Sequence, residues 1–163
     1  MGHKVIDVRQ VIPAPPAAVF ATLLDRSEWP AWSGHTKFEL VRPGAAGPYD
    51  VGSVGLLSSG RRRVMREEIV EVVGDRRIGY TLLAGLPLRG YRAGFELAPV
   101  PEGTAVSWHS SFDAPPGFGW IYVAALRRFT RRLLDGLARR VVTVAAGSGT
   151  QAAPSPERFR DRT

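Results

Sequence analysis

Apolar residues recur at steps of three and four positions in one long stretch near the C-terminus, over residues 118–144. Arginines fill many of the positions between them, and this spacing is typical of an amphipathic helix. At 1.5 Å per residue, a helix of this length would extend roughly 40 Å. The members of the apolar stripe are Tyr122, Leu126, Phe129, Leu133, Leu137 and Val141.

Short runs rich in β-branched and aromatic residues precede that helix. We expect strands over residues 4–12, 38–41, 52–58, 62–73, 78–83, 89–97 and 104–112. Most of these runs are separated by short connections with Gly, Pro or Asp, which favour the hairpins of an antiparallel meander. Because 62–73 is long for a strand, we expect strong curvature or a bulge within it.

Two short helices are expected between the first two strands. The proline-rich segment 13–16 ends the first strand because proline donates no hydrogen bond to a sheet, and Pro16 suits the first turn of a helix. Residues 17–24 have helical composition, and Asp25 or Ser27 can cap a second short helix. The order of elements predicts an α+β fold in which one long helix lies across a curved antiparallel sheet of six to seven strands.

Alternation with a period of two assigns the faces of the later strands. On the strand over 104–112, the set that includes Trp108 is expected to face the helix, which leaves His109 on the outer side. The strand over 62–73 mixes charge with apolar residues on both faces, so its inward set stays open. The residues that alternation turns inward are Ile78, Tyr80, Leu82, Tyr91, Ala93, Phe95, Leu97, Val106, Trp108, Ser110 and Phe112.

Length and composition narrow the class of protein. A chain of 163 residues suits one domain, which we expect over 1–146, followed by a disordered tail over 147–163 that is rich in small, polar and proline residues. The absence of cysteine excludes disulfides and thiol chemistry and favours a cytoplasmic location. No apolar run approaches the roughly 18–20 residues of a membrane span, and the first ten residues do not resemble a signal peptide.

Charge is concentrated on the predicted C-terminal helix. The chain carries a net charge of +7. Residues 118–144 contain six arginines but only one acidic residue, Asp135. Such a surface can attract an acidic carrier protein, although a solvated helix face is the commoner explanation. Aromatic residues do not interleave with these arginines as they do in single-strand binders, so no nucleic acid is expected. The arginines are Arg127, Arg128, Arg131, Arg132, Arg139 and Arg140.

Motifs for cofactors are missing from the sequence. It contains no Gly-rich nucleotide loop, no Gly-x-Ser-x-Gly elbow and no pair of histidines at metal-ligand spacing. The three histidines, His3, His35 and His109, lie far apart along the chain. We therefore expect no cofactor and no metal site.

Several segments carry a family resemblance. Near the N-terminus they are Ile12–Pro16, Val19–Phe20 and Asp25–Trp32; later ones are Arg66–Ile69, Tyr80–Pro87, Gly103–Thr104 and Val106–Trp108. In pattern and order they resemble the START-like, Bet v 1-type superfamily (SRPBCC), and its polyketide cyclase/dehydrase group above all. The resemblance covers about residues 5–144. It implies a helix-grip fold, in which the sheet wraps around the long helix and leaves an apolar cavity between them.

The resemblance also implies a function, namely binding of a hydrophobic or aromatic small molecule with polyketide cyclase/dehydrase-like activity. Arg66 lies nearest to the group's cavity arginine, which can polarise a carbonyl, and the phenols of Tyr80 and Tyr91 can act beside it. Alternatively, Arg66 is an ordinary surface residue, and Tyr80 and Tyr91 only pack their rings in the interior. The candidate ligand-binding residues are Trp29, Trp32, Phe95, Trp108, Ser110, Phe112, Tyr122, Leu126 and Phe129.

Two other functions stay open at this point. The same cavity would serve a non-catalytic carrier or sensor of lipids or other small molecules. Alternatively, the arginine-rich helix would make the domain an adaptor for an acidic partner. The sequence is compatible with a monomer or a homodimer.

Overall fold

The computed structural model describes residues 2–60 and 63–148. Its strands are β1 (Gly2–Ile12), β2 (Lys37–Arg42), β3 (Val54–Ser59), β4 (Arg63–Val73), β5 (Arg77–Ala84), β6 (Arg89–Val100) and β7 (Gly103–Ala114). Its helices are α1 (Pro16–Leu24), the 3-10 turn η1 (Arg26–Glu28), α2 (Trp29–Trp32) and α3 (Gly119–Ser148). The tail that we expect to be disordered covers residues 147–163. Residues 147 and 148 instead belong to α3, and the other positions lie outside the described residues.

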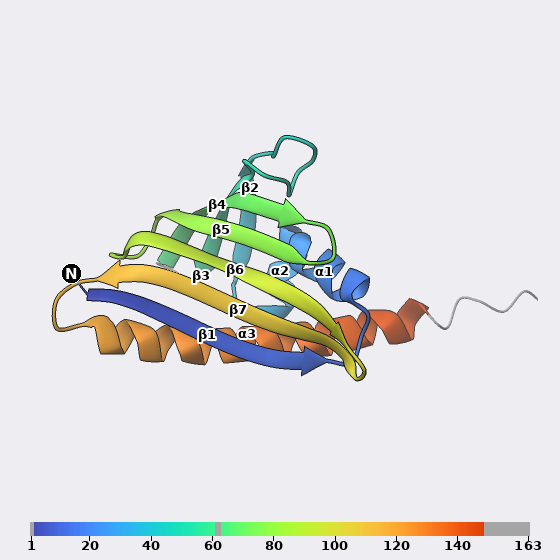
Figure 1. The fold of residues 1–163 in the computed structure, drawn as a ribbon. Helices are drawn as coiled ribbons and strands as arrows, with labels where there is room; N and C mark the ends of the chain where they lie inside the picture. The colour runs from blue at the N-terminus through green and yellow to red at the C-terminus, as the bar shows by residue number, and fades with distance from the viewer. Residues whose placement is uncertain (1, 61–62, 149–163) are drawn as a thin grey trace, which may run out of the picture.

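The strands form one antiparallel sheet of seven strands in the order β1-β7-β6-β5-β4-β3-β2 (Figure 1). Strands β2 to β7 follow one another as the predicted meander, because each pairs with its neighbour in sequence. Strand β1 completes the sheet by pairing along its whole length with β7, from Gly2 opposite Ala114 to Ile12 opposite Thr104. The predicted strands are thus confirmed, with bounds shifted by a few residues.

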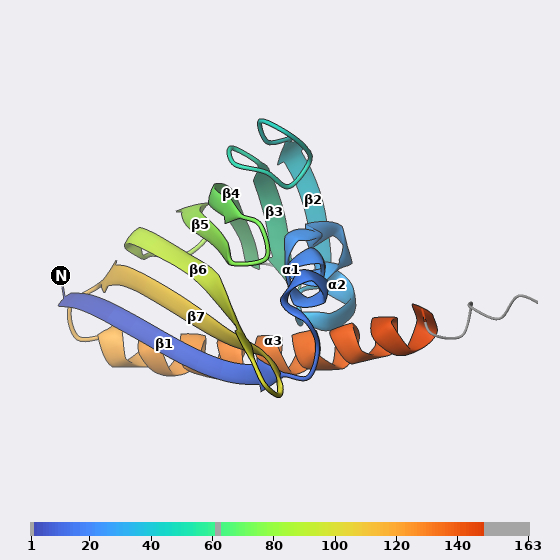
Figure 2. The ribbon, with the colours of Figure 1, turned by 45° about the vertical axis from the view of Figure 1, so that its right-hand side comes forward.

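Helix α3 runs along the concave side of this strongly curved sheet, and α1 and α2 lie at one end of it (Figure 2). Asp25 caps the η1 turn by accepting a hydrogen bond from the backbone N–H of Ser27, as a capping aspartate should. The arrangement is the helix-grip fold that the sequence predicts. Within the described ranges, no helix has both the length and the apolar character needed to cross a membrane.

Strand β4 contains the predicted irregularity. Its pairing with β5 shifts register between Arg66 and Glu67 and again between Ile69 and Glu71. Glu67 and Ile69 are buried on the inner face. Strict alternation would turn Val73 inward as well, but beyond the second shift it is Val72 that packs against the core. The second shift adds Val70 to β4 and changes which residues face inward beyond it, so no single alternation holds along the whole strand.

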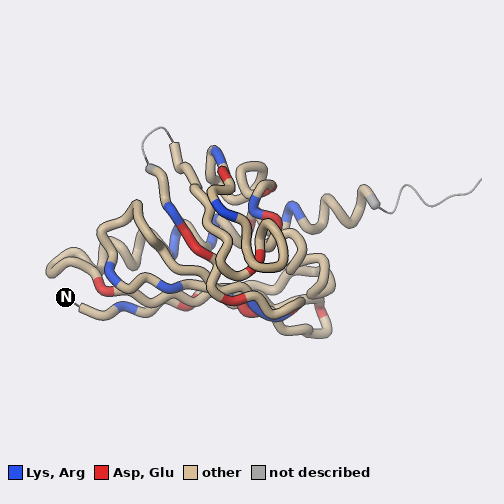
Figure 3. The backbone as a smooth tube through the Cα atoms, turned by 90° about the horizontal axis from the view of Figure 1, so that it is seen from above, with Lys and Arg blue, Asp and Glu red and all other residues tan. Residues whose placement is uncertain are grey.

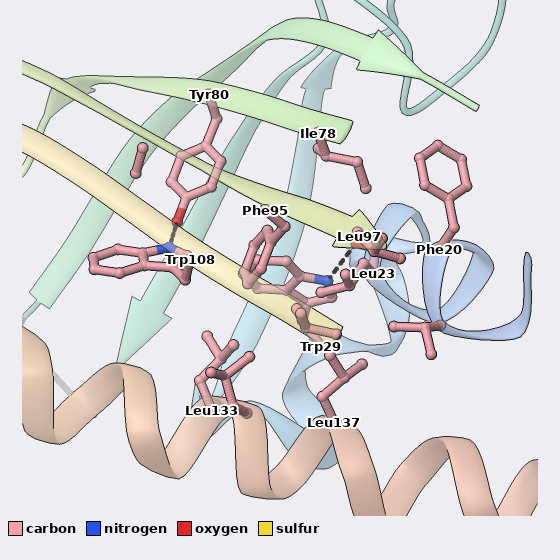
Figure 4. Close-up of a cluster of buried hydrophobic side chains, with 14 of the residues drawn as sticks. Phe20, Leu23, Trp29, Ile78, Tyr80, Phe95, Leu97, Trp108, Leu133 and Leu137 are labelled. Atoms are coloured by element: carbon pink, nitrogen blue, oxygen red, sulfur yellow. Dashed lines mark hydrogen bonds between the residues drawn. The ribbon is translucent and has the colours of Figure 1, made fainter. Parts of the chain in front are cut away.

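The core is closely packed where α3 meets α1 and α2. Leu134 and Leu137 of α3 are fully buried there, together with Leu23 of α1. At Gly136 the helix approaches α2 so closely that an added Cβ would overlap the carbonyl oxygen of Trp32. Figure 4 shows the adjoining cluster, in which Leu133 and Leu137 point from α3 towards Trp29. At this end of the interface, α3 is packed directly against α1 and α2.

Candidate functional site: a cavity between the sheet and the first half of α3

A cavity of about 420 Å³ lies between the sheet and the N-terminal half of α3. Ile121 and Ala125 of α3 line it and are exposed, so they mark its open side. Trp29 and Leu133 line it towards the dense core. The remaining lining residues are His35, Ser59, Met65, Glu67, Tyr80, Leu82, Leu86, Tyr91, Trp108, Tyr122, Leu126 and Phe129.

Most of the expected aromatic residues lie on this lining. Tyr80, Tyr91 and Trp108 come from the inner faces of β5, β6 and β7, where period-two alternation places them. Tyr122, Leu126 and Phe129 come from α3, and Trp29 comes from α2. The fold thus brings residues from five elements to one apolar enclosure.

Four of the candidate ligand-binding residues do not line this cavity. Trp32, Phe95, Ser110 and Phe112 are buried in the protein interior but are not among the cavity-lining residues. Phe95 packs edge-on against Trp29, with ring centroids 6.3 Å apart, and so supports the cavity wall from behind. Alternation gives the direction of a side chain but not its distance from the helix, so it cannot separate lining residues from core residues.

The expected place of Arg66 in the cavity is also wrong. Arg66 is exposed on the outer face of β4, whereas the next residue, Glu67, is 7% exposed and lines the cavity. An inward Arg66 would require the opposite register of the strand, which would turn Glu67 and Ile69 to solvent. The charged side chain of β4 that points into the cavity is therefore the carboxylate of Glu67.

Glu67 is held by a buried arginine from η1. Arg26 Nη1 donates a hydrogen bond to Glu67 Oε2 at 2.7 Å, and Arg26 is only 3% exposed. The Arg26 guanidinium also lies 4.6 Å from the ring centroid of Trp29 and 4.9 Å from that of Tyr80. A buried ion pair requires such close partners because both charges lose their hydration. Nothing in the local sequence indicates this pair, since its members are 41 positions apart.

Tyr80 and Tyr91, two of the three tyrosines on the cavity lining, are held as neutral phenols. Trp108 Nε1 donates a hydrogen bond to the hydroxyl oxygen of Tyr80 at 2.8 Å (Figure 4). Burial, followed by the negative charge of Glu67, raises the pKa of Tyr80 well above its usual value. Burial also raises the pKa of Tyr91, and Tyr80 and Glu67 add to that effect. Both residues therefore stay protonated at neutral pH and can donate hydrogen bonds, but they cannot act as phenolate bases.

His35 is a site residue that the sequence analysis missed. It follows α2 after a turn at Gly34, whose φ of +85° lies in the left-handed region that favours glycine. The imidazole is 4% exposed and lines the cavity. Burial and then the positive charge of Arg26 lower the pKa of His35 to about 4, so the ring is neutral at pH 7. Only the three-dimensional structure shows its contacts, because a lone histidine in sequence carries no such signal.

The cavity therefore offers apolar walls, the hydroxyls of three tyrosines, one carboxylate paired with arginine and one neutral imidazole. Among the described residues, no group of three or more His, Cys, Asp or Glu side chains is arranged to hold a metal ion. Such a site can enclose an apolar ring system and form hydrogen bonds to a few of its oxygen or nitrogen atoms.

The fold and the cavity define a START-like, Bet v 1-type helix-grip protein. The sequence profile of the family described as "Polyketide cyclase / dehydrase and lipid transport" matches residues 3–145, and the chain belongs to this family. Both the family and the fold fit a protein that binds hydrophobic ligands. No curated protein sequence matches the chain.

Solved structures show the same fold at low sequence identity. A START superfamily protein from Mycobacterium smegmatis has a TM-score of 0.75 and 15% identity, with 88% of this chain and 99% of that chain covered. Ara h 8.0201 has a TM-score of 0.69 and 19% identity over 87% of this chain and 99% of its own. A protein from Nitrosospira multiformis has a TM-score of 0.69 and 21% identity over 85% and 96% of the two chains.

Proposed function

We propose that the chain binds a compact, largely apolar molecule with one or more rings in the cavity between the sheet and α3. The observation that carries this proposal is the cavity itself, of about 420 Å³ and lined mainly by aromatic and aliphatic side chains. This volume falls in the lower part of the range of about 300–1,000 Å³ typical of small-molecule sites. The family description, which includes lipid transport, supports the same class of ligand.

Binding is tested by narrowing the open side of the cavity. Ala125→Phe adds a ring at the exposed edge of the lining, whereas Ala124→Phe adds the same ring at the neighbouring α3 residue, which lies outside this lining. Native mass spectrometry of the purified wild type should show a co-purified small molecule or binding of naphthalene-sized probes. Ala125→Phe should weaken binding and Ala124→Phe should not. Equal binding by both variants would contradict the proposal.

We further propose polyketide cyclase/dehydrase-like chemistry for this site. The cavity would fold a flexible poly-ketone so that an enol carbon adds to a carbonyl carbon, and orientation would supply most of the acceleration. As the new C–C bond forms, the carbonyl π bond breaks and the enol O–H proton passes to the new alkoxide oxygen. The protonated hydroxyls of Tyr91 and Tyr80 would donate hydrogen bonds to the carbonyl oxygens where negative charge develops. The family description supports this reaction class, and the exposed position of Arg66 removes it from the mechanism.

A matched pair of variants separates catalysis from carriage. Tyr91→Phe removes a cavity hydroxyl, whereas Tyr49→Phe removes one outside the cavity lining. With a poly-β-ketone thioester as substrate, Tyr91→Phe should lower turnover about 100-fold and leave binding nearly unchanged. Tyr49→Phe should leave both unchanged. Binding without any turnover by the wild type would instead indicate a non-catalytic carrier or sensor.

The outer face of α3 favours a second, compatible role in binding an acidic carrier protein. An open groove of about 880 Å³ runs between α3 and β1. Its lining contains the basic residues Lys4, Arg127, Arg128, Arg131 and Arg132 and the aromatic residue Trp120. In the view from above, by contrast, basic and acidic residues are interspersed over the sheet (Figure 3). A surface of one sign attracts an acidic partner by long-range electrostatics.

This docking role predicts salt-sensitive binding. A purified acidic acyl carrier protein should bind the wild type and lose most of its affinity as the salt concentration rises from about 0.05 to 0.5 M. Replacing the four arginines of the groove with alanine should abolish binding. The same charge change on exposed arginines away from this groove should have little effect, and an equal loss there would contradict the docking role. The control positions are Arg9, Arg66, Arg76 and Arg92.

A further inference from the structure

His35 lies at the junction between the cavity and the dense core. Its ring centroid is 5.8 Å from that of Trp29 and 5.3 Å from that of Phe129, which it meets edge-on. Both of these aromatic residues also line the cavity. The imidazole is therefore held between rings, and its orientation is fixed by packing as well as by hydrogen bonds.

The hydrogen bonds of Ser33 determine which nitrogen of His35 carries the proton. Ser33 Oγ lies 2.7 Å from the carbonyl oxygen of Trp29, which can only accept, so the single hydroxyl hydrogen is donated there. Ser33 Oγ must then accept at its other contacts, which are His35 Nδ1 at 2.7 Å and the backbone N–H of His35 at 3.3 Å. Nδ1 therefore carries the proton, and in the neutral ring Nε2 carries a lone pair.

Nε2 has no hydrogen-bond partner among residues 2–60 and 63–148, although the ring lines the cavity. An acceptor in a largely apolar enclosure costs free energy when nothing donates to it. The charged group that acts on the ring is Arg26, whose guanidinium disfavours protonation of the imidazole. The other titratable groups on the cavity lining are Glu67, Tyr80, Tyr91 and Tyr122.

We infer that His35 Nε2 is the cavity's acceptor for a ligand hydroxyl or N–H, and that it selects hydroxylated ring compounds such as phenols and enols. This inference rests on the proposed ligand-binding function and adds the chemical class of the ligand. The neutral hydroxyls of Tyr80 and Tyr91 complement it, because they can donate to a carbonyl oxygen on the same molecule. An enol-containing aromatic ketone would satisfy both kinds of group at once.

Three probes of similar shape test this inference in the wild-type protein at pH 7. Naphthalene has no polar group, 2-methoxynaphthalene has an acceptor oxygen only, and 2-naphthol has a hydroxyl that can donate. We expect 2-naphthol to bind about tenfold more tightly than 2-methoxynaphthalene, the ratio given by one additional buried hydrogen bond. Calorimetric titration measures all three dissociation constants.

Substitution of the histidine identifies the acceptor. His35→Phe keeps an aromatic ring between Trp29 and Phe129 but removes Nε2, and it should reduce the preference for 2-naphthol to within about twofold. His109→Phe makes the same change at an exposed position on the outer side of the sheet and should retain the full preference. A preference that persists in a folded His35→Phe variant would overturn the inference and assign the acceptor to another group.

A spectroscopic measurement keeps the test independent of that variant's folding. In ¹⁵N-labelled wild type, the His35 signals should show a proton on Nδ1 and an unprotonated Nε2, and only Nε2 should shift strongly when 2-naphthol is added. Binding of all three probes with equal affinity and no shift at Nε2 would overturn the inference and leave the proposed function intact. Failure of every probe to bind would overturn both.

Discussion

The two halves of α3 meet the rest of the protein in different ways. In the second half, Leu134, Leu137 and Val141 are at most 1% exposed, and Gly136 allows backbone contact with α2. In the first half, Tyr122 and Leu126 are only partly buried and face a cavity of about 420 Å³. One continuous helix thus packs closely against the protein in its C-terminal half and borders a cavity in its N-terminal half.

The difference shows how this fold combines stability with an internal binding site. Fully burying a leucine side chain contributes about 1.5–3 kcal/mol, so the second half of α3 can anchor the helix while the first half borders the cavity. Trp29 lies between the two regions, and its Nε1 donates a hydrogen bond to the carbonyl oxygen of Leu23 at 3.0 Å (Figure 4). Mutations in the two regions should therefore have separable effects on stability and on binding.

The largest effect is expected at the ion pair beside Trp29. Glu67→Leu leaves the buried guanidinium of Arg26 without its carboxylate, which should lower the free energy of unfolding by about 3–5 kcal/mol. The double variant Arg26→Met/Glu67→Leu should recover most of that loss. Glu68→Leu breaks a more exposed pair with Arg42 and should cost less than about 1 kcal/mol. Urea unfolding measures each change, and similar losses for Glu67→Leu and Glu68→Leu would contradict the assignment.

Leucine truncation on α3 compares the two halves directly. Leu137→Ala should lower the free energy of unfolding by about 2–5 kcal/mol, because it leaves a void in a filled region. Leu126→Ala should cost less than half as much, since that side chain already borders open space, and it should alter ligand affinity. Equal destabilisation by the two substitutions would contradict the described difference between the two halves of α3.

The stability of the protein should depend on the protonation of His35. The folded-state pKa of about 4 lies below the usual 6.5, so the unfolded chain takes up the proton first as the pH falls. The stabilising contribution is complete above about pH 6.5, is lost progressively towards pH 4, and amounts to about 3 kcal/mol. Urea unfolding at several pH values should show this loss in the wild type and a smaller one in His35→Phe. Parallel pH profiles for the two proteins would show that His35 is not the source of the loss of stability at low pH.

The smallest of these effects distinguishes two glycines of α3. In a helix, Gly→Ala usually stabilises by about 0.5–1 kcal/mol, and Gly147 has open space around it. At Gly136 the new methyl group would overlap the Trp32 carbonyl oxygen, so Gly136→Ala should destabilise by about 1–3 kcal/mol. Thermal unfolding measures both changes, and stabilisation at Gly136 would show that the interface is looser than described.

The sequence predicts the fold well because its signals are local. Strand alternation, the prolines at 13–16 and the apolar stripe of α3 each depend on neighbouring residues. The lining aromatic residues Tyr80, Tyr91 and Trp108 follow from the same alternation. These features need no knowledge of how distant elements pack.

The charged and polar part of the site could not be predicted in this way. The bulge at Val70 changes which residues of β4 face inward beyond it, and the burial of Glu67 depends on Arg26 from a distant segment. The role of His35 depends on a serine hydroxyl that is itself oriented by the carbonyl oxygen of Trp29. These arrangements arise from tertiary packing. Alternation leaves the inward face of β4 open, and only the family resemblance implies a cavity role for the neighbouring Arg66.

The most direct test of an open space under the first half of α3 is an NMR measurement of contacts to a bound guest. In protein with labelled methyl groups, naphthalene should give intermolecular nuclear Overhauser effects to Leu126 and Leu133, which line the cavity. It should give none to Leu134 or Leu137 in the filled half of the interface. Contacts restricted to Leu134 and Leu137, or the absence of any contact at saturating naphthalene, would contradict the account.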